Sequence, residues 1–140
     1  MEQLKLENQL CFPFYSVSRL IVRKYQPYLD ALEITYPQYL VLLVLWETDS
    51  QAVNQIAQTL FLQTSTITPL LKRLEGQGIV QRGKSLADER KVIISLTEKG
   101  KHMKEQAAHI PHKLAENLTI PESELGELRN MLHRMIDILR

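Results

Sequence analysis

The sequence predicts a mainly α-helical fold that carries one small β-hairpin. Apolar residues recur every three or four positions through most of the 140 residues, which is the period of amphipathic helices. Two strand-like segments, residues 79–82 and 91–96, interrupt this period and are joined by a charged loop. Two short helical segments directly precede them. This order of helix, helix and hairpin is typical of a winged helix-turn-helix.

The first helix is predicted over residues 9–32. Its recurring apolar residues are Phe14, Val17, Ile21, Tyr25, Leu29 and Leu32. Pro13 lies near the helix start, where a proline is best tolerated, although it can kink the first turn.

A second helix is predicted to begin at Thr35 or Tyr36, with Pro37 in its first turn. Residues 39–46 are apolar on every face, which predicts a helix that is buried all round. A buried parallel strand is the alternative interpretation of this run, but its length and the proline at its start favour a helix.

The two short helices before the hairpin are predicted over residues 53–60 and 64–75. The first is expected to turn Ile56, Ala57 and Leu60 inward. The buried stripe of the second falls at i, i+3, i+4 and i+7, at Ile67, Leu70, Leu71 and Leu74. Pro69 conflicts with a helix because it has no amide donor, and we expect it early enough for the loss to be tolerated. Gly76 and Gly78 are expected to end the helix.

The last third of the chain continues the hairpin and then returns to helices. In the second strand the residues predicted to face the core are Val92, Ile94 and Leu96. Thr97 and Glu98 are expected to begin a helix that runs toward Ile110 and stops near Pro111. Another helix is expected after Pro121, with an apolar stripe at Leu125, Leu128, Leu132, Met135 and Leu139.

Positive charge is concentrated in the helix–hairpin segment. The net charge of the chain is only +1. Residues 63–91 hold six basic against three acidic residues, a net charge of +3, whereas residues 1–62 have −2 and residues 92–140 have 0. A local excess of cations is what contact with nucleic-acid phosphates requires.

Composition also excludes several classes of protein. The N-terminus lacks a basic region followed by an apolar one, so no signal peptide is expected. The longest apolar run is too short to span a bilayer, and no membrane partner is expected. A single cysteine excludes an internal disulfide framework. A cytoplasmic protein is therefore expected.

The helix over residues 64–75 and the loop that follows offer side chains suited to double-stranded DNA. Short polar side chains at the helix start can approach base edges in the major groove, and the cations further on can meet phosphates; these residues are Thr64, Ser65, Thr66, Thr68, Lys72 and Arg73. In the hairpin the expected DNA-binding residues are Arg82, Lys84, Asp88 and Arg90. Arg90 can enter a minor groove while Asp88 holds its guanidinium. A merely solvated helix face and a surface ion pair are the alternatives.

Cys11 is a second candidate site, because it lies near a helix start, where the helix dipole favours a thiolate. A small buried hydrophobe is the alternative role for a lone cysteine. Tyr15, four residues later, lies on the same helix face and can donate to the sulfur. Tyr25 lies ~21 Å further along the axis and can reach Cys11 only from an antiparallel partner subunit. Tyr36 is a third candidate donor.

These residues resemble a known family of regulators. The motifs that carry the resemblance to the MarR family of winged-helix repressors are Leu71-Lys72-Arg73-Leu74-Glu75, Gly78-Ile79-Val80, Asp88-Glu89-Arg90 and Ile94-Ser95-Leu96-Thr97. The motifs similar to its one-cysteine organic hydroperoxide sensors, the OhrR branch, are Asn8-Gln9-Leu10-Cys11-Phe12, Tyr15, Tyr25 and Ile34-Thr35-Tyr36-Pro37-Gln38-Tyr39-Leu40. Redox regulators of the MgrA and SarZ kind share much of this pattern, which covers nearly the whole chain.

The resemblance implies a dimeric domain organisation. A single MarR-type domain is expected over residues 1–140, with residues 36–97 forming the DNA-binding part and residues 1–35 and 98–140 forming dimerisation helices. Two departures are visible. Pro13 replaces the aliphatic or polar residue that usually follows the cysteine by two positions, and Gly83, Leu86 and Ala87 make the wing less charged than usual.

The expected function is that of a homodimeric repressor that binds operator DNA and releases it when an organic hydroperoxide oxidises Cys11 to a sulfenic acid. Because the chain has no second cysteine, the next step needs further oxidation or an external thiol, such as a low-molecular-weight thiol forming a mixed disulfide. No cofactor and no enzymatic activity are expected.

Three other functions were weighed against this one. The first is a MarR-type repressor released by a non-covalent small ligand. The second is a one-cysteine peroxidase, and the third is a protein-interaction module that uses the C-terminal stripe. His109 and His112 have metal-like spacing, but Pro111 separates them and no thiol or carboxylate lies nearby, so no metal site is expected.

Overall fold

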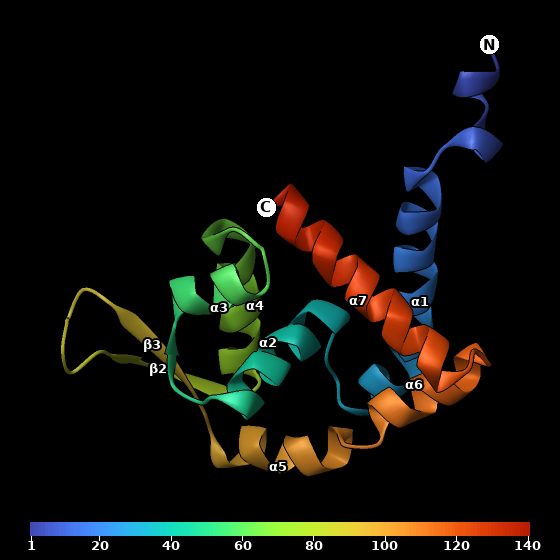
Figure 1. The fold of residues 1–140 in the computed structure, drawn as a ribbon. Helices are drawn as coiled ribbons and strands as arrows, with labels where there is room; N and C mark the ends of the chain where they lie inside the picture. The colour runs from blue at the N-terminus through green and yellow to red at the C-terminus, as the bar shows by residue number, and fades with distance from the viewer. The chain divides into compact units, whose positions relative to one another are not determined.

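The computed structural model describes residues 1–140 and divides into two compact units, Met1–Ala108 and His109–Arg140 (Figure 1). The first unit contains the 3₁₀ turns η1 (Glu2–Leu4) and η2 (Leu6–Asn8), the helices α1 (Cys11–Ala31), α2 (Tyr36–Glu47), α3 (Val53–Thr59), α4 (Thr64–Gly76) and α5 (Glu98–Ala107), and the strands β1 (Gln51–Ala52), β2 (Val80–Lys84) and β3 (Val92–Leu96). The second unit contains α6 (Ile110–Leu118) and α7 (Glu122–Leu139). None of the helices combines the length and the apolarity needed to cross a membrane.

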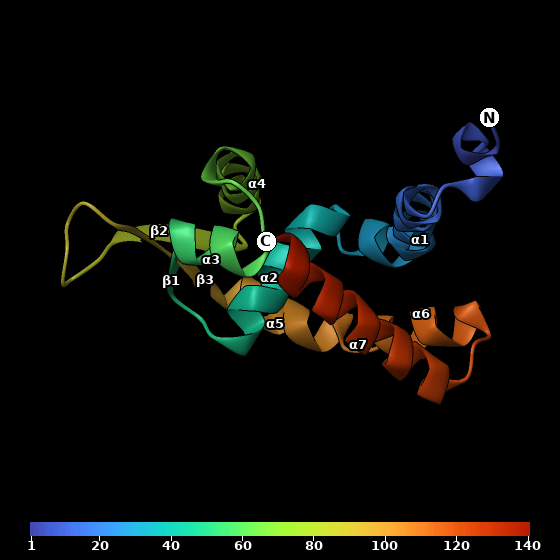
Figure 2. The ribbon, with the colours of Figure 1, turned by 45° about the horizontal axis from the view of Figure 1, so that its top comes forward.

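The predicted fold class is confirmed, because α3, α4 and a β2–β3 hairpin follow one another as in a winged helix. The sheet is antiparallel in the order β1-β3-β2, with Arg82 opposite Ile94 and Val80 opposite Leu96. The hairpin extends beyond α3 and α4 in both views (Figure 2). We call the segment from Val80 to Leu96 the wing.

Strand β1 is absent from the sequence-based prediction. It has only two residues, and its pairing of Gln51 with Ile94 defines it. Val92 also differs from expectation, since it is 38% exposed rather than turned into the core. Its partner in β2 is Lys84, and the two form the last strand pair before the hairpin loop, where the sheet ends.

Helix α2 begins where the sequence predicts. The Thr35 side chain accepts a hydrogen bond from the Gln38 amide, and the Gln38 side chain accepts one from the Thr35 amide at 2.8 Å, which forms a capping box. Pro37 lies in the first turn. The expectation that residues 39–46 are buried all round is wrong at Leu43, which is 40% exposed. Helices α1, α3, α4 and α5 pack on α2 and leave that face open.

Helix α4 carries the predicted stripe. Ile67, Leu70, Leu71 and Leu74 are all buried. Pro69 is the sixth residue of the helix, so only the hydrogen bond to the carbonyl of Ser65 is lost. Gln77 is the C-cap, and Gly78 follows with a φ of +73°, a conformation that favours glycine.

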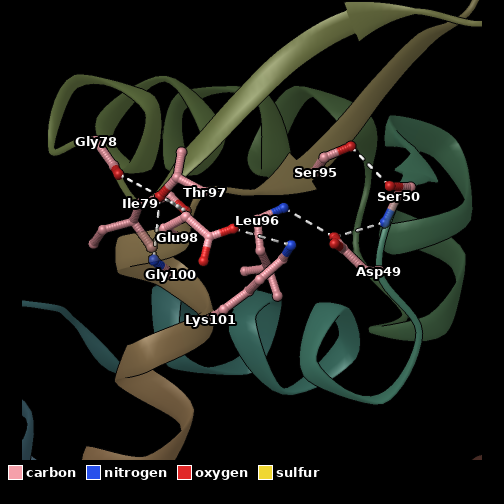
Figure 3. Close-up of polar contacts among 10 residues, drawn as sticks. All are labelled: Asp49, Ser50, Gly78, Ile79, Ser95, Leu96, Thr97, Glu98, Gly100 and Lys101. Atoms are coloured by element: carbon pink, nitrogen blue, oxygen red, sulfur yellow. Dashed lines mark hydrogen bonds and ion pairs between the residues drawn. The ribbon is translucent and has the colours of Figure 1, made fainter.

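The start of α5 is hydrogen-bonded to the residues that follow α4 (Figure 3). The Thr97 hydroxyl donates to the carbonyls of Gly78 and Ile79 and accepts from the Gly100 amide at 3.1 Å. On the other side of β3, Asp49 accepts a hydrogen bond from the Leu96 amide at 2.9 Å. This junction anchors the wing to the helices.

The prediction that one helix runs toward Ile110 and stops near Pro111 is wrong. Helix α5 ends at Ala107, and Pro111 lies in the first turn of a separate helix, α6. A proline at that position gives up only a donor that a helix start leaves unpaired anyway. Helix α7 forms where expected, and none of its residues is buried.

Candidate DNA-binding surface and cysteine sensor site

The exposed side of α4 presents the polar side chains that the sequence singled out. Thr64, Ser65 and Thr66 are exposed in the first turn, and Lys72 and Arg73 are exposed two turns later. Thr68 is half-buried, and its hydroxyl donates to the carbonyl of Thr64 at 2.8 Å. Because the opposite side of α4 is buried, this face is the one that can enter a major groove. We call α4 the recognition helix.

Arg82 and Lys84, two cations of the wing, differ in how accessible their side chains are to a ligand. The Arg82 guanidinium contacts the Glu75 carboxylate of the recognition helix, with Nε and Oε2 3.3 Å apart. Its side chain is 31% exposed. Lys84 is exposed. Arg82 therefore ties the wing to α4 and keeps only part of its guanidinium available to a ligand.

Asp88 and Arg90 form the pair that their spacing predicts. Asp88 Oδ1 accepts from the Arg90 amide at 3.0 Å and from Arg90 Nε at 3.2 Å. These bonds, the backbone one first, lower the pKa of Asp88. The Arg90 side chain is 91% exposed, so Asp88 orients a guanidinium that still faces solvent.

The wing loop is closed by hydrogen bonds of its own. The Ser85 hydroxyl accepts from the amides of Ala87 and Asp88, and the Ser85 amide donates to the carbonyl of Lys91 at 3.0 Å. Leu86 is fully exposed beside them. These contacts hold the loop in a turn that presents Arg90 outward.

A hollow of about 310 Å³ joins the recognition helix to the wing. Its lining comprises Ala52, Val53, Asn54, Thr64, Arg90, Lys91 and Val92. The hollow places the start of α4 beside two cations, and a helix start with free amides favours an anion. Asn54 and Lys91 were not predicted from the sequence, because their proximity to Thr64 depends on the tertiary fold.

Cys11 is the first residue of α1 and is exposed. The alternative role of a buried hydrophobe is therefore excluded within one protomer. Tyr15 is also exposed, and its ring lies under the Arg19 guanidinium, 4.8 Å from ring centroid to Cζ. No hydrogen bond joins Cys11 to Tyr15, Tyr25 or Tyr36 in the protomer, so a sensor that uses those hydroxyls needs a second subunit or a shift of the helix start.

Tyr25 and Tyr36 meet in an aromatic cluster that the sequence did not predict. Their ring centroids are 4.8 Å apart, and Tyr39 lies 5.8 Å from Tyr25 and 6.1 Å from Tyr36. Trp46 contacts Tyr39 edge-on at 6.4 Å. Burial, and then the neighbouring phenols, raise the pKa of Tyr25 to about 12, and burial also raises the pKa of Tyr36 and Tyr39.

Comparison with known proteins agrees with this geometry. Residues 23–107 match the family model described as transcriptional regulator SarA/Rot. The organic hydroperoxide resistance transcriptional regulator of Bacillus subtilis is 44% identical over 138 residues, which cover 99% of this chain and 94% of that protein. The chain belongs to the MarR family, in its branch of OhrR-type redox regulators.

Other MarR-family members are similar along almost their whole length. The regulator SarZ of Staphylococcus aureus is 37% identical over 136 residues, covering 97% of this chain and 92% of that protein. The structure of reduced AbfR of Staphylococcus epidermidis bound to DNA has a TM-score of 0.80 and 40% identity, and covers 99% of this chain and 96% of that one. This MarR-family chain is thus a DNA-binding transcriptional regulator of the redox-sensing kind.

The raised pKa of Tyr25 predicts a late step in the alkaline titration of this MarR-family protein. The fold binds the phenolic proton more tightly than the unfolded chain, whose pKa is 10.0. Its contribution to stability is therefore complete below pH 10 and is lost as pH rises from there through about 12. Phenolate absorbance should show this step in the native protein and in Tyr15→Phe, and the step should be smaller in Tyr25→Phe, where Tyr36 and Tyr39 still titrate above their ordinary pKa. Titration of all five tyrosines in one step near their ordinary pKa would contradict the prediction.

Proposed function

We propose that this protein is a homodimeric repressor that binds operator DNA when Cys11 is reduced and releases it after an organic hydroperoxide oxidises Cys11. The observation that carries the proposal is the exposed, sole cysteine at the first residue of α1. It occurs in a chain 44% identical to a regulator named for organic hydroperoxide resistance.

The proposed chemistry begins with attack of the Cys11 thiolate on the terminal oxygen of the hydroperoxide. The O–O bond breaks, the alkoxide leaves and takes a proton to become the alcohol, and the sulfur becomes a sulfenic acid. The sulfenic acid then condenses with a low-molecular-weight thiol to a mixed disulfide and releases water. Structures of AbfR include an overoxidised form bound to DNA and a disulfide form. Because the overoxidised AbfR is bound to DNA, we favour a disulfide of Cys11, rather than overoxidation, as the released state.

The proposed sensor is shared between two subunits. Helix α1 exposes Phe12, Phe14 and Val17, and helix α7 exposes Leu128 and Met131, which are apolar surfaces that a second copy of the chain would cover. Tyr25 lies ~21 Å along α1 from Cys11, so an antiparallel partner helix is what would bring it to the sulfur together with Tyr36. Tyr15 would donate from the same subunit.

The DNA contacts are proposed on the surface described above. Thr64, Ser65, Thr66 and Thr68 approach base edges from the recognition helix, Lys72 and Arg73 meet phosphates, and Arg82, Lys84 and the Asp88-oriented Arg90 serve the wing. Two recognition helices of a dimer would then occupy successive major grooves, about 34 Å apart. A change in their spacing after oxidation removes one of the two sets of contacts.

The test compares native protein with Cys11→Ser on the DNA upstream of the protein's own gene. Adding cumene hydroperoxide with a low-molecular-weight thiol should weaken binding of native protein by about tenfold or more and leave Cys11→Ser unchanged. Mass spectrometry should show the matching adduct on Cys11.

Two outcomes would redirect the proposal. Release of DNA by the Cys11→Ser protein would show that the signal acts elsewhere, as a non-covalent ligand does. Sustained consumption of hydroperoxide by sub-stoichiometric protein would instead indicate a peroxidase.

A further inference from the structure

Gln38 is the only polar residue in the buried core, with 3% of its surface exposed. Its side-chain oxygen accepts a hydrogen bond from the Thr35 amide at 2.8 Å, within the capping box that begins α2. Its side-chain nitrogen donates to Gln77 Oε1 at 3.1 Å. Removing the hydrogen-bond partner of a buried amide destabilises the fold, because water cannot reach the amide and replace the bond. The partners of the Gln38 side chain are therefore held in place.

Gln77 extends this contact to a second segment. Its side-chain nitrogen donates to the backbone carbonyl of Glu33 at 2.6 Å. Glu33 lies between α1 and α2 with a φ of 58°, in the left-handed region that residues with side chains rarely adopt. The backbone carbonyl of Gln77 accepts from Lys99 Nζ of α5 at 2.8 Å. We call the set Glu33, Thr35, Gln38 and Gln77 the amide clamp.

The amide clamp connects the two places where function is proposed. At one end it holds the corner between α1 and α2, and Tyr36, the residue between Thr35 and Gln38 that starts α2, contacts Tyr25 of α1. At the other end Gln77 is the C-cap of the recognition helix, and its amide donates to the carbonyl of Arg73 at 3.0 Å. A movement of the corner can therefore act on the end of α4 through the Gln77 side chain, in addition to the packing of α2 on α4.

The residues directly after Gln77 are held from another direction. Gly78 and Ile79 give their carbonyls to Thr97, the N-cap of α5 (Figure 3). The end of α4 is thus fixed on one side by α5 and on the other by the corner.

We propose that Gln77 is a positioning residue that transmits the oxidation state of the sensor to the recognition helix. This rests on the proposed redox function. When oxidation of Cys11 displaces the tyrosines, the α1–α2 corner moves, and the amide clamp carries the C-terminal end of α4 with it. Without the clamp, the corner moves and α4 stays in its DNA-binding position.

The experiment measures operator affinity of reduced and oxidised protein for four chains. They are the native chain, Gln77→Ala, which loses both side-chain bonds, Gln77→Glu, which keeps an acceptor for Gln38 but loses the donor to Glu33, and Gln106→Ala, an exposed glutamine of α5 as control. The readout is the ratio of reduced to oxidised affinity, together with the rate of Cys11 oxidation and the melting temperature.

The ratio should shrink by about fivefold or more in Gln77→Ala, by less in Gln77→Glu, and not at all in Gln106→Ala. The rate of Cys11 oxidation should stay as in the native chain. Loss of reduced affinity with an unchanged ratio would show a merely structural role and overturn the proposal, as would a native ratio in both Gln77 variants.

If Gln77→Ala does not fold, Gln77→Glu decides, because it retains the partner of the buried Gln38 amide. A native chain whose affinity ignores hydroperoxide refutes the proposed function itself. If the operator affinity of the native chain and of both Gln77 variants responds equally to hydroperoxide, the role of the amide clamp is refuted while the proposed function stands.

Discussion

Replacing Gly100 with alanine is expected to lower the free energy of unfolding by about 3 kcal/mol, at the upper end of what overpacking a core costs. A Cβ on Gly100 would lie 2.2 Å from the backbone carbonyl oxygen of Ile79 and 3.1 Å from Cδ2 of Leu96. The first contact is with backbone, so no side-chain rotation relieves it. Gly100 must therefore separate from Ile79.

That separation would break the junction of Figure 3. Thr97 donates to Ile79 and accepts from Gly100, and Trp46 Nε1 donates to the carbonyl of Gly100 at 2.9 Å. The matched control is Gly76→Ala, because a Cβ there meets nothing within 4 Å and its φ is not positive. Its stability should be unchanged or higher by up to about 1 kcal/mol.

Denaturant unfolding of both variants measures this difference. We expect Gly100→Ala to shift the midpoint down and Gly76→Ala to leave it or raise it. Equal midpoints for the two variants would mean that α5 can move away from Ile79 freely, and the junction would then not anchor the wing.

Replacing Arg90 with alanine is expected to weaken operator binding by about 30-fold or more, because each protomer of the proposed dimer would lose a proposed DNA contact worth about 1 kcal/mol or more. Arg90 is 91% exposed, and Asp88 holds it by two hydrogen bonds at the wing. It also lines the hollow that reaches Thr64 of the recognition helix.

The salt dependence of binding distinguishes the loss of a phosphate contact at the wing from the loss of a cation elsewhere on the protein. The slope of log affinity against log salt should become shallower by about 1 for each protomer in Arg90→Ala. Lys101→Ala removes an exposed cation of α5, which pairs with Glu98 at 3.5 Å, and should leave the slope unchanged. Fluorescence anisotropy over a range of salt concentrations gives both quantities. An unaltered affinity in Arg90→Ala would refute the wing assignment.

Much of the fold could be predicted because it follows from local periodicity. Ile67, Leu70, Leu71 and Leu74 are buried at the spacing that places them on one helix face. The start of α2 at Thr35 was equally local, because a capping box needs only residues three positions apart. The Asp88–Arg90 pair was predicted from residues two apart in an extended segment; the pair forms, but in a turn that the Lys91 amide closes on the Asp88 carbonyl.

The predictions were wrong where the local structure depends on contacts between segments that are distant in sequence. Strand β1 has only two residues and is defined by its pairing with β3, so sequence periodicity could not predict it. A proline can end one helix or lie in the first turn of the next, and the sequence alone did not show that Pro111 lies in the first turn of α6. Leu43 is apolar but exposed, because burial depends on which helices cover α2.

The sequence by itself determined the winged helix-turn-helix, the polar face of the recognition helix, the wing pair and the single cysteine at a helix start, since each depends on residues within a few positions of one another. Only the tertiary structure decided that Tyr25 meets Tyr36, that Asn54 and Arg90 line one hollow, and that Gln77 joins Gln38 and Glu33 across separations of 39 and 44 residues. The physical reason is that backbone geometry repeats along the chain, whereas these contacts form only after packing of the apolar faces has chosen which segments meet.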